Sequence, residues 1–239
     1  MTSNQSIIAK SCSFYLAEKL GSHSFVALNK KIIKCKKCPR LNSYIKEISQ
    51  TKVKRFKDQK YWSKPLPGFG DVNGKVLIVG LAPAAHGGNR TGRMFTGDSS
   101  GDWLAKVLYE NGFATQPVSS HKTDGFCLIN AYITAVVRCA PPENKPLDTE
   151  LKNCSEYLKN EFAILQNLEI IICLGRIAFT TVCRILGIKG QNFSHGNVFK
   201  HGTKLIICSY HPSRQNTQTG RLTWTQWNLI FVKARRYSK

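Results

Sequence analysis

Apolar runs alternate with amphipathic stretches along residues 65–239. Short, mostly apolar runs that end at turn residues predict buried strands, and four such runs span 76–80, 126–137, 169–175 and 204–209. The stretches between and after them predict helices over 100–113, 149–165, 176–187 and 222–237. Strands that alternate with helices predict an α/β fold, a three-layer sandwich with a central four-stranded parallel sheet flanked by helices.

The first 65 residues differ from the rest because they are rich in lysine and predicted to be helical, and they contain the basic run KVKRFKDQK at 52–60. The Pro/Gly cluster PLPGFGD then marks the start of the region that carries the motifs. We expect residues 26–239 to form one domain and residues 1–25 to be an extension of unassigned role. We also expect no membrane partner and a cytoplasmic location, since the sequence shows neither a long apolar run nor a secretion signal.

Charge adds a candidate partner. The chain has 35 lysines and arginines against 14 aspartates and glutamates, a net charge of +21. Such an excess favours a polyanionic partner, and nucleic acid is the expected one, bound with an affinity that falls as salt rises. A general drift towards lysine explains the same excess without any partner, since lysines outnumber arginines and lie along the whole chain.

A glycine-rich segment, GLAPAAHGGNRTGRMFTGD at 80–98, follows the strand predicted at 76–80. Part of it, GGNRTGRM, approaches the P-loop pattern of nucleotide-binding proteins. Arg93 stands in place of the P-loop lysine, however, and Met94 in place of the hydroxyl that would bind magnesium. An NTPase with a structural zinc site is therefore only a weak alternative.

Nine cysteines without a secretion signal favour a reduced protein in which some cysteines bind metal. Cys35 and Cys38 form a CxxC pair, a spacing that places two thiolates on one metal. Taken alone, this pair is equally consistent with a redox pair or with chance. Cys139 and Cys154 follow further along the chain, and four thiolates suit zinc and an iron–sulfur cluster equally well.

Two long motifs, GLAPAAHGGNRTGRMFTGD and YHPSRQNTQTGRLT at 210–223, resemble the uracil-DNA glycosylase superfamily, in particular its type B, or family-five, branch. The resemblance implies removal of uracil and other deaminated bases from DNA by base flipping, which leaves an abasic site. It implies uracil-containing DNA, single- or double-stranded, as the partner, and we expect a monomer. It also implies a [4Fe–4S] cluster held by Cys35, Cys38, Cys139 and Cys154.

The resemblance gives Phe95 the role of the aromatic residue that stacks on the flipped base, against the alternative of a plain core phenylalanine. Glycines in the first motif allow the backbone to approach base and phosphate closely. The further residues expected to line the base pocket are Gly80, Ala82, Pro83, Ala84, His86 and Asn89.

Cleavage of a glycosidic bond leaves negative charge on the departing base. His211, directly after the strand predicted at 204–209, is expected to donate a hydrogen bond to the base oxygen where this charge grows; a histidine that caps a turn is the alternative. Ser213 is expected to bind phosphate together with the backbone amides of its loop. Arg214, Gln215 and Asn216 are expected to reach the minor groove or fill the space left by the base, and are equally plausible as solvated loop residues.

No residue directly after Pro83 can orient water, because Ala84 and Ala85 stand there. The resemblance moves this role to Asp98 or Asn144. A carboxylate at Asp98 can position water or stabilise the sugar cation, and it suits the N-cap of the next helix equally well. Asn144 is the weaker candidate, since asparagine in a proline-rich turn is often only a turn residue. The alanines also keep a second class of function open, a non-catalytic damaged-DNA-binding protein of the same fold.

Overall fold

The apolar runs form four parallel strands in a computed structural model that describes residues 23–238. These strands are β2 (Val76–Gly80), β3 (Ala131–Ala135), β4 (Ile170–Leu174) and β6 (Lys204–Ser209). The sheet order is β1-β3-β2-β4-β6-β5, and the pairs β3–β2, β2–β4 and β4–β6 are parallel. Nearly every residue of these strands is buried, as expected where helices cover both faces of a parallel sheet. The predicted four-stranded parallel core is therefore confirmed.

Two antiparallel edge strands, β1 (Phe69–Gly70) and β5 (Val198–His201), extend the sheet to six strands, so the prediction of four was incomplete. Neither has the continuous apolar run of a buried strand, since β1 lies in the Pro/Gly cluster and β5 is half exposed. The strand predicted at 126–137 is also shorter in the structure. Its pairing begins after Asn130, which has a left-handed backbone (φ +55°) and whose side-chain oxygen accepts a hydrogen bond from the Lys75 amide at 2.8 Å.

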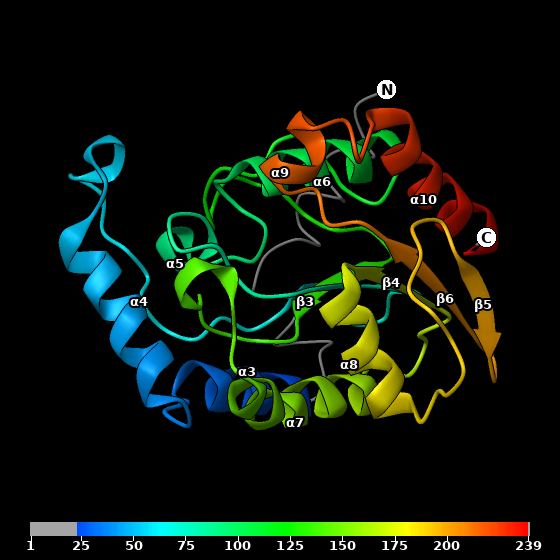
Figure 1. The fold of residues 1–239 in the computed structure, drawn as a ribbon, viewed down its shortest axis with the longest axis horizontal. Coiled ribbons are helices and arrows are strands. Elements are labelled where there is room, and N and C mark those ends of the chain that lie inside the picture. Colours follow the sequence, from blue (N-terminus) through cyan, green and yellow to red (C-terminus); the bar gives the residue numbers. More distant parts are fainter. Residues whose placement is uncertain (1–22, 239) are drawn as a thin grey trace.

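Helices cover both faces of the sheet and confirm the three-layer prediction (Figure 1). One face packs against α3 (His23–Ile33), α4 (Pro39–Thr51), α7 (Asp148–Ile164) and α8 (Arg176–Leu186), through Leu77, Val79 and other strand residues that point to that side. The opposite face packs against α6 (Ser99–Glu110) and α10 (Trp224–Tyr237). Short helices lie in the connections: η1 (Lys54–Phe56), α5 (Gly88–Thr91), η2 (Pro142–Asn144) and α9 (Arg214–Gln218).

The boundary predicted between residues 25 and 26 falls inside α3. Phe25 is buried and contacts Tyr132 of β3 edge to face, with ring centroids 5.3 Å apart. The helix thus packs on the sheet from close to its first described residue, and the greater part of the predicted extension, residues 1–22, lies outside the described residues. In the part of the chain that the structure describes, no helix is long and apolar enough to cross a membrane.

A buried ion pair ties α7 to the sheet. Glu161 of α7 has no exposed surface, and its Oε2 accepts hydrogen bonds from Arg138 Nη2 at 2.6 Å and from Thr134 Oγ1 at 2.7 Å. Arg138 itself is 1% exposed and directly precedes Cys139. Removing one partner of such a pair leaves an unpaired buried charge, which is far more costly than loss of a surface pair.

We expect Glu161→Gln to lower the free energy of unfolding by about 3–5 kcal/mol, because Arg138 then keeps its charge in the core without a counter-charge. Glu110→Gln is the matched control, since Glu110 pairs with Lys106 at 4.0 Å on the surface of α6, and exposed pairs contribute about 0–1 kcal/mol. Urea unfolding of both variants measures the difference. Equal losses in the two variants would contradict the prediction.

Candidate active site

The motifs predicted from the sequence meet at one edge of the sheet. The carboxyl ends of the parallel strands β2, β3, β4 and β6 lie together, which is where ligands bind in open α/β sheets. The first motif continues from β2, and the HPS motif follows β6. The two loops are brought into contact by Phe95 and His211, whose ring centroids are 5.8 Å apart with the ring planes inclined by 33°.

The ring of Phe95 lies against the last residue of β2. A Cβ atom placed on Gly80 would come within 2.6 Å of Phe95 Cζ, so only glycine fits there. Phe95 has a left-handed backbone (φ +48°), a conformation that costs a non-glycine residue about 1–3 kcal/mol and that the surroundings must enforce. Gly101 of α6 contributes, because a Cβ there would lie 2.4 Å from the Phe95 carbonyl oxygen.

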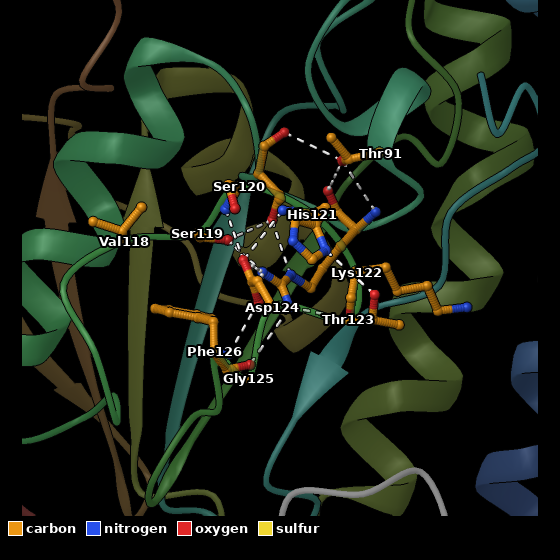
Figure 2. Close-up of polar contacts among 12 residues, drawn as sticks. Thr91, Val118, Ser119, Ser120, His121, Lys122, Thr123, Asp124, Gly125 and Phe126 are labelled. Carbon is orange, nitrogen blue, oxygen red and sulfur yellow. Dashed lines mark hydrogen bonds and ion pairs between the residues drawn. The ribbon is translucent and has the colours of Figure 1, made fainter. Parts of the chain in front are cut away.

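A network of polar groups gathers around Asp124 (Figure 2). Through Arg93 and Thr96 it holds the chain on both sides of Phe95. Arg93 is 7% exposed, and its Nη2 donates to both carboxylate oxygens of Asp124 at 2.8 Å and to Ser119 Oγ at 2.7 Å. Its Nε donates to Thr96 Oγ1 at 3.0 Å. Asp124 also accepts hydrogen bonds from three backbone amides of its own loop. Arg93, which stands where a P-loop has its lysine, therefore fixes the conformation of the Phe95 loop.

His211 follows β6 and lies beside the Phe95 ring. The protein around the imidazole lowers its pKa to about 4, because burial disfavours the charged ring. The ring is therefore neutral at physiological pH and has one N–H to donate. Asn216 fixes the backbone of this residue, since its amide nitrogen donates to the His211 carbonyl oxygen at 2.8 Å.

Asp98 caps α6 and also faces the first motif. Its Oδ1 accepts a hydrogen bond from the Gly101 amide at 3.0 Å, while its Oδ2 lies so close to Gly87 that a Cβ there would approach it to 1.9 Å. Burial raises the pKa of the Asp98 carboxyl, and the hydrogen bonds at the N-cap and the charges of Arg90 and Arg214 offset part of that rise. The N-cap expected from the sequence is thus present, and the second oxygen remains directed at the loop.

Arg90 is a residue that the sequence reasoning missed. Its Nε donates to the His86 carbonyl at 2.7 Å, its Nη2 to the Gly97 carbonyl at 2.9 Å and its Nη1 to Gln59 Oε1 at 2.6 Å. It therefore holds both ends of the motif loop beside Asp98. Its main acceptors are backbone carbonyls, which every residue has, so the sequence does not reveal which of them an arginine will bind. The only sequence signal for this role of Arg90 was a basic residue inside the motif.

The other predicted pocket residues have different surroundings. His86 Nδ1 lies 3.0 Å from the Tyr61 hydroxyl, and burial lowers the pKa of this histidine. Asn89 has no exposed surface, and its amide donates to the carbonyls of Ile45 and Ala85, so it ties the loop to α4. The backbone of the motif turns here as well: Pro83 is buried, Ala82 and Ala84 are half-buried, and the Ala84 carbonyl accepts from the amides of Gly87 and Asn89.

Asn144 does not join this group. It ends η2 with an exposed side chain and a left-handed backbone (φ +58°), as a turn residue does. Within residues 23–238, no hydrogen bond or ring contact links it to Asp98, Phe95 or His211.

The residues expected to contact DNA lie on α9, directly after His211. Ser213 caps this helix by accepting a hydrogen bond from the Asn216 amide. Arg214 and Gln215 are exposed. A hollow of about 250 Å³ opens beside His211 and Asn216, and its other walls are Gly175, Arg176, Phe193, Ser194, Tyr210 and Arg221. Phe95 contacts His211 but does not line this hollow.

The four cysteines singled out in the sequence come from three segments. Cys35 and Cys38 lie between α3 and α4, Cys139 follows β3, and Cys154 belongs to α7. All are free thiols that influence one another: burial, together with the charges of Cys38 and Cys35, raises the pKa of Cys154 to about 11. An all-sulfur set of this kind suits zinc or an iron–sulfur cluster. In the described part of the chain, no group of three or more His, Cys, Asp or Glu side chains is arranged to hold a single metal ion.

Comparison with known proteins agrees with this geometry. The model of the uracil DNA glycosylase superfamily matches residues 67–231, which contain both motif loops. A protein of Mycobacterium tuberculosis named type-5 uracil-DNA glycosylase is 44% identical over 222 residues, 90% of this chain and 82% of its own length. A Thermus thermophilus protein of the same name is 42% identical over 205 residues, 84% of this chain and 93% of its own. A type-4 uracil-DNA glycosylase of Archaeoglobus fulgidus is 27% identical over 197 residues.

The match to the family model and the identity to proteins named type-5 both extend over most of the chain. The strands and loops that carry Phe95, Asp98 and His211 lie inside the matched region. The chain therefore belongs to the uracil-DNA glycosylase superfamily, and within it to the type-5 group.

Proposed function

We propose that the protein is a monofunctional DNA glycosylase that hydrolyses the N-glycosidic bond of uracil, and of other deaminated bases, and leaves an abasic site. The observation that carries the proposal is the contact between Phe95 and His211 at the edge where the two motif loops meet. An aromatic face beside a neutral N–H donor suits a flipped base, which stacks on the one and is hydrogen-bonded by the other. The protein acts as a monomer in the cytoplasm, on single- or double-stranded DNA.

His211 acts on the leaving base. As the glycosidic bond breaks, negative charge grows on the base oxygen, and a preorganised N–H lowers the energy of that state. A neutral imidazole suits this role because burying it does not require a positive charge to be removed from water. The low pKa of His211 keeps the ring neutral. The hydrogen bond from Asn216 to the His211 carbonyl fixes the direction of approach.

Asp98 acts on the sugar and the water. The sugar gains positive character as the base leaves, and a carboxylate near it stabilises that charge and orients water for attack. We assign this role to Asp98 before Asn144, because Asp98 lies against the motif loop while Asn144 is exposed on η2. We assign the lining of the base pocket to Gly80, Ala82, Pro83, Ala84 and His86 together with Phe95, and a supporting role to the buried Asn89, which bonds the Ile45 carbonyl. Ser213, Arg214, Gln215 and Asn216 contact the DNA strand.

A [4Fe–4S] cluster held by Cys35, Cys38, Cys139 and Cys154 completes the proposal. Each of the buried thiols Cys139 and Cys154 feels the charge of the other cysteines, and the four come from three separate segments of the chain. When bound, the cluster supplies four covalent links and no reactive group. These links fasten the α3–α4 turn and α7 to the loop after β3, where Arg138 already anchors the chain.

The function is tested with a duplex containing one uracil, treated with alkali after incubation, which cuts the strand at an abasic site. We expect cleavage by the parent protein, and a fall in single-turnover rate of about 10²–10³-fold for His211→Ala, the loss typical of one oxyanion donor. His201→Ala, an exposed residue of β5, is the matched control and retains the parent rate. Tight binding of this duplex by the parent without cleavage would instead identify a non-catalytic damaged-DNA-binding protein.

Asp98→Asn separates the two roles of Asp98, because asparagine also caps helices well and so preserves α6. We expect the single-turnover rate to fall about 10²-fold or more, the contribution typical of a general base. The parent rate falls as pH is lowered through the raised pKa of Asp98, since the carboxylate is the active form, and this acid limb is absent in the variant. An unchanged rate would leave Asp98 as an N-cap only.

Cys139→Ala is expected to abolish bound iron and the visible absorbance of thiolate–iron bonds in anaerobically purified protein, because a cluster needs all four thiolates. Cys183→Ala is the matched control, since Cys183 is an equally buried free thiol of α8 outside the set. Elemental analysis measures the outcome. A colourless parent that carries zinc would overturn the choice of an iron–sulfur cluster.

A further inference from the structure

A strongly basic segment between α4 and the sheet has no role in the site described above. Residues 52–60, KVKRFKDQK, form what we call the basic arm, with the short helix η1 at its centre. It carries five cations, and Asp58 is its only acid. Figure 1 shows the arm at the far end of α4, outside the stacked layers of the fold. Its charged side chains are exposed, apart from Lys52, which is half-buried.

The cations of the arm have no carboxylate partner. Among residues 23–238, every ion pair uses a lysine or arginine outside 52–60. Exposed cations outside close ion pairs attract dissolved ions, and a polyanion that displaces those ions gains free energy from their release. The arm is therefore suited to bind a chain of phosphates.

Hydrogen bonds fix the conformation of the basic arm. The backbone amides of Phe56, Lys57 and Gln59 donate to carbonyls within the segment, and Lys52 Nζ donates to the Lys57 carbonyl at 3.1 Å. Directly after it, the amides of Trp62 and Ser63 donate to the carbonyls of residues 90 and 89 at 3.0 and 3.1 Å. A segment fixed in this way presents its charges in one place, so little ordering is needed on binding.

Arg90 joins the arm to the active site. Its guanidinium lies over the Phe56 ring, 3.8 Å from the centroid, and bonds Gln59, while its other nitrogens hold the carbonyls of the loop next to Asp98. Arg55 lies 4.4 Å from the same ring. Burial raises the pKa of Asp102 in the first turn of α6, and the charge of Arg55 offsets part of that rise. The arm thus stands beside the Asp98 side of the pocket, while Arg214 approaches Asp98 from α9.

We propose that the basic arm binds the phosphate backbone of the DNA to one side of the flipped nucleotide, and that Arg90 sets its position relative to the pocket. This inference rests on the proposed glycosylase function. The ligand is the sugar–phosphate backbone of the substrate strand or its complement, read without regard to sequence, because lysines and arginines on an exposed helix contact phosphates as point charges. The arm and α9 would then hold the DNA on both sides of the pocket.

The test replaces Lys54, Lys57 and Lys60 with glutamine, which keeps a polar side chain at each position and removes its charge. Each lost phosphate contact lowers the slope of log affinity against log salt by about 0.9, so three lower it by about 2.7. Over a fourfold rise in salt, the parent should lose about 40-fold more affinity for a long uracil duplex than the variant. In steady-state assays the change falls on KM more than on kcat.

The matched control replaces three other exposed lysines with glutamine: Lys159 of α7, Lys189 in the loop after α8, and Lys200 of β5. This control removes the same total charge and should keep the parent slope of log affinity against log salt. An equal change of slope in both variants would mean that only net charge matters, which would overturn the proposal. The proposal would also be overturned if the arm variant had the same slope as the parent protein.

Substrate length separates this inference from the proposed function. With duplexes shortened on one side of the uracil or on the other, the difference between parent and arm variant should disappear for one truncation only, which identifies the side that the arm contacts. A difference that survives both truncations contradicts the proposal. Failure of the parent to cleave uracil from any of these duplexes would instead refute the glycosylase function.

Discussion

The close approach of the Phe95 ring to the backbone of Gly80 determines the geometry of the site. No side chain fits between them, since a Cβ on Gly80 would lie 2.6 Å from the ring. The ring occupies the end of β2, and its backbone accordingly turns into the left-handed region. His211, carried to the same edge by β6, meets the ring there. Loss of this approach would separate the stacking surface from the hydrogen-bond donor.

Arginine side chains hold the loops of the site in place, in addition to the burial of Met94 and Phe95 in the core. Arg93, two residues before Phe95, binds Asp124 and Ser119, and Arg90 donates to the carbonyls of His86 and Gly97 in the motif loop. A planar guanidinium with five donors can satisfy several acceptors at fixed angles. Loops rich in glycine have little apolar surface to bury, so fixed polar contacts are the available means of holding them rigid.

The central sheet and its helices could be predicted from the sequence because apolar runs and amphipathic stretches are local patterns. The edge strand β5 could not, since its pairing with β6 depends on a neighbour and not on its own residues. The motifs predicted that Phe95, Asp98 and His211 share one site. The structure brings Phe95 and His211 into contact and places Asp98 against Gly87 of the first motif. The roles of Arg90 and Asn89 were hidden, because their acceptors are backbone carbonyls that only the fold brings near.

Two pairs of opposite charges, Arg93 with Asp124 and Arg138 with Glu161, are withdrawn into the interior. Because each buried pair is neutral, the surface carries the same net charge, and fewer acidic side chains lie among its lysines and arginines. A field of one sign keeps copies of the protein apart and attracts intact duplex as well as damaged duplex. Attraction that does not depend on sequence lets a protein slide along DNA, and its strength falls as the ionic strength rises.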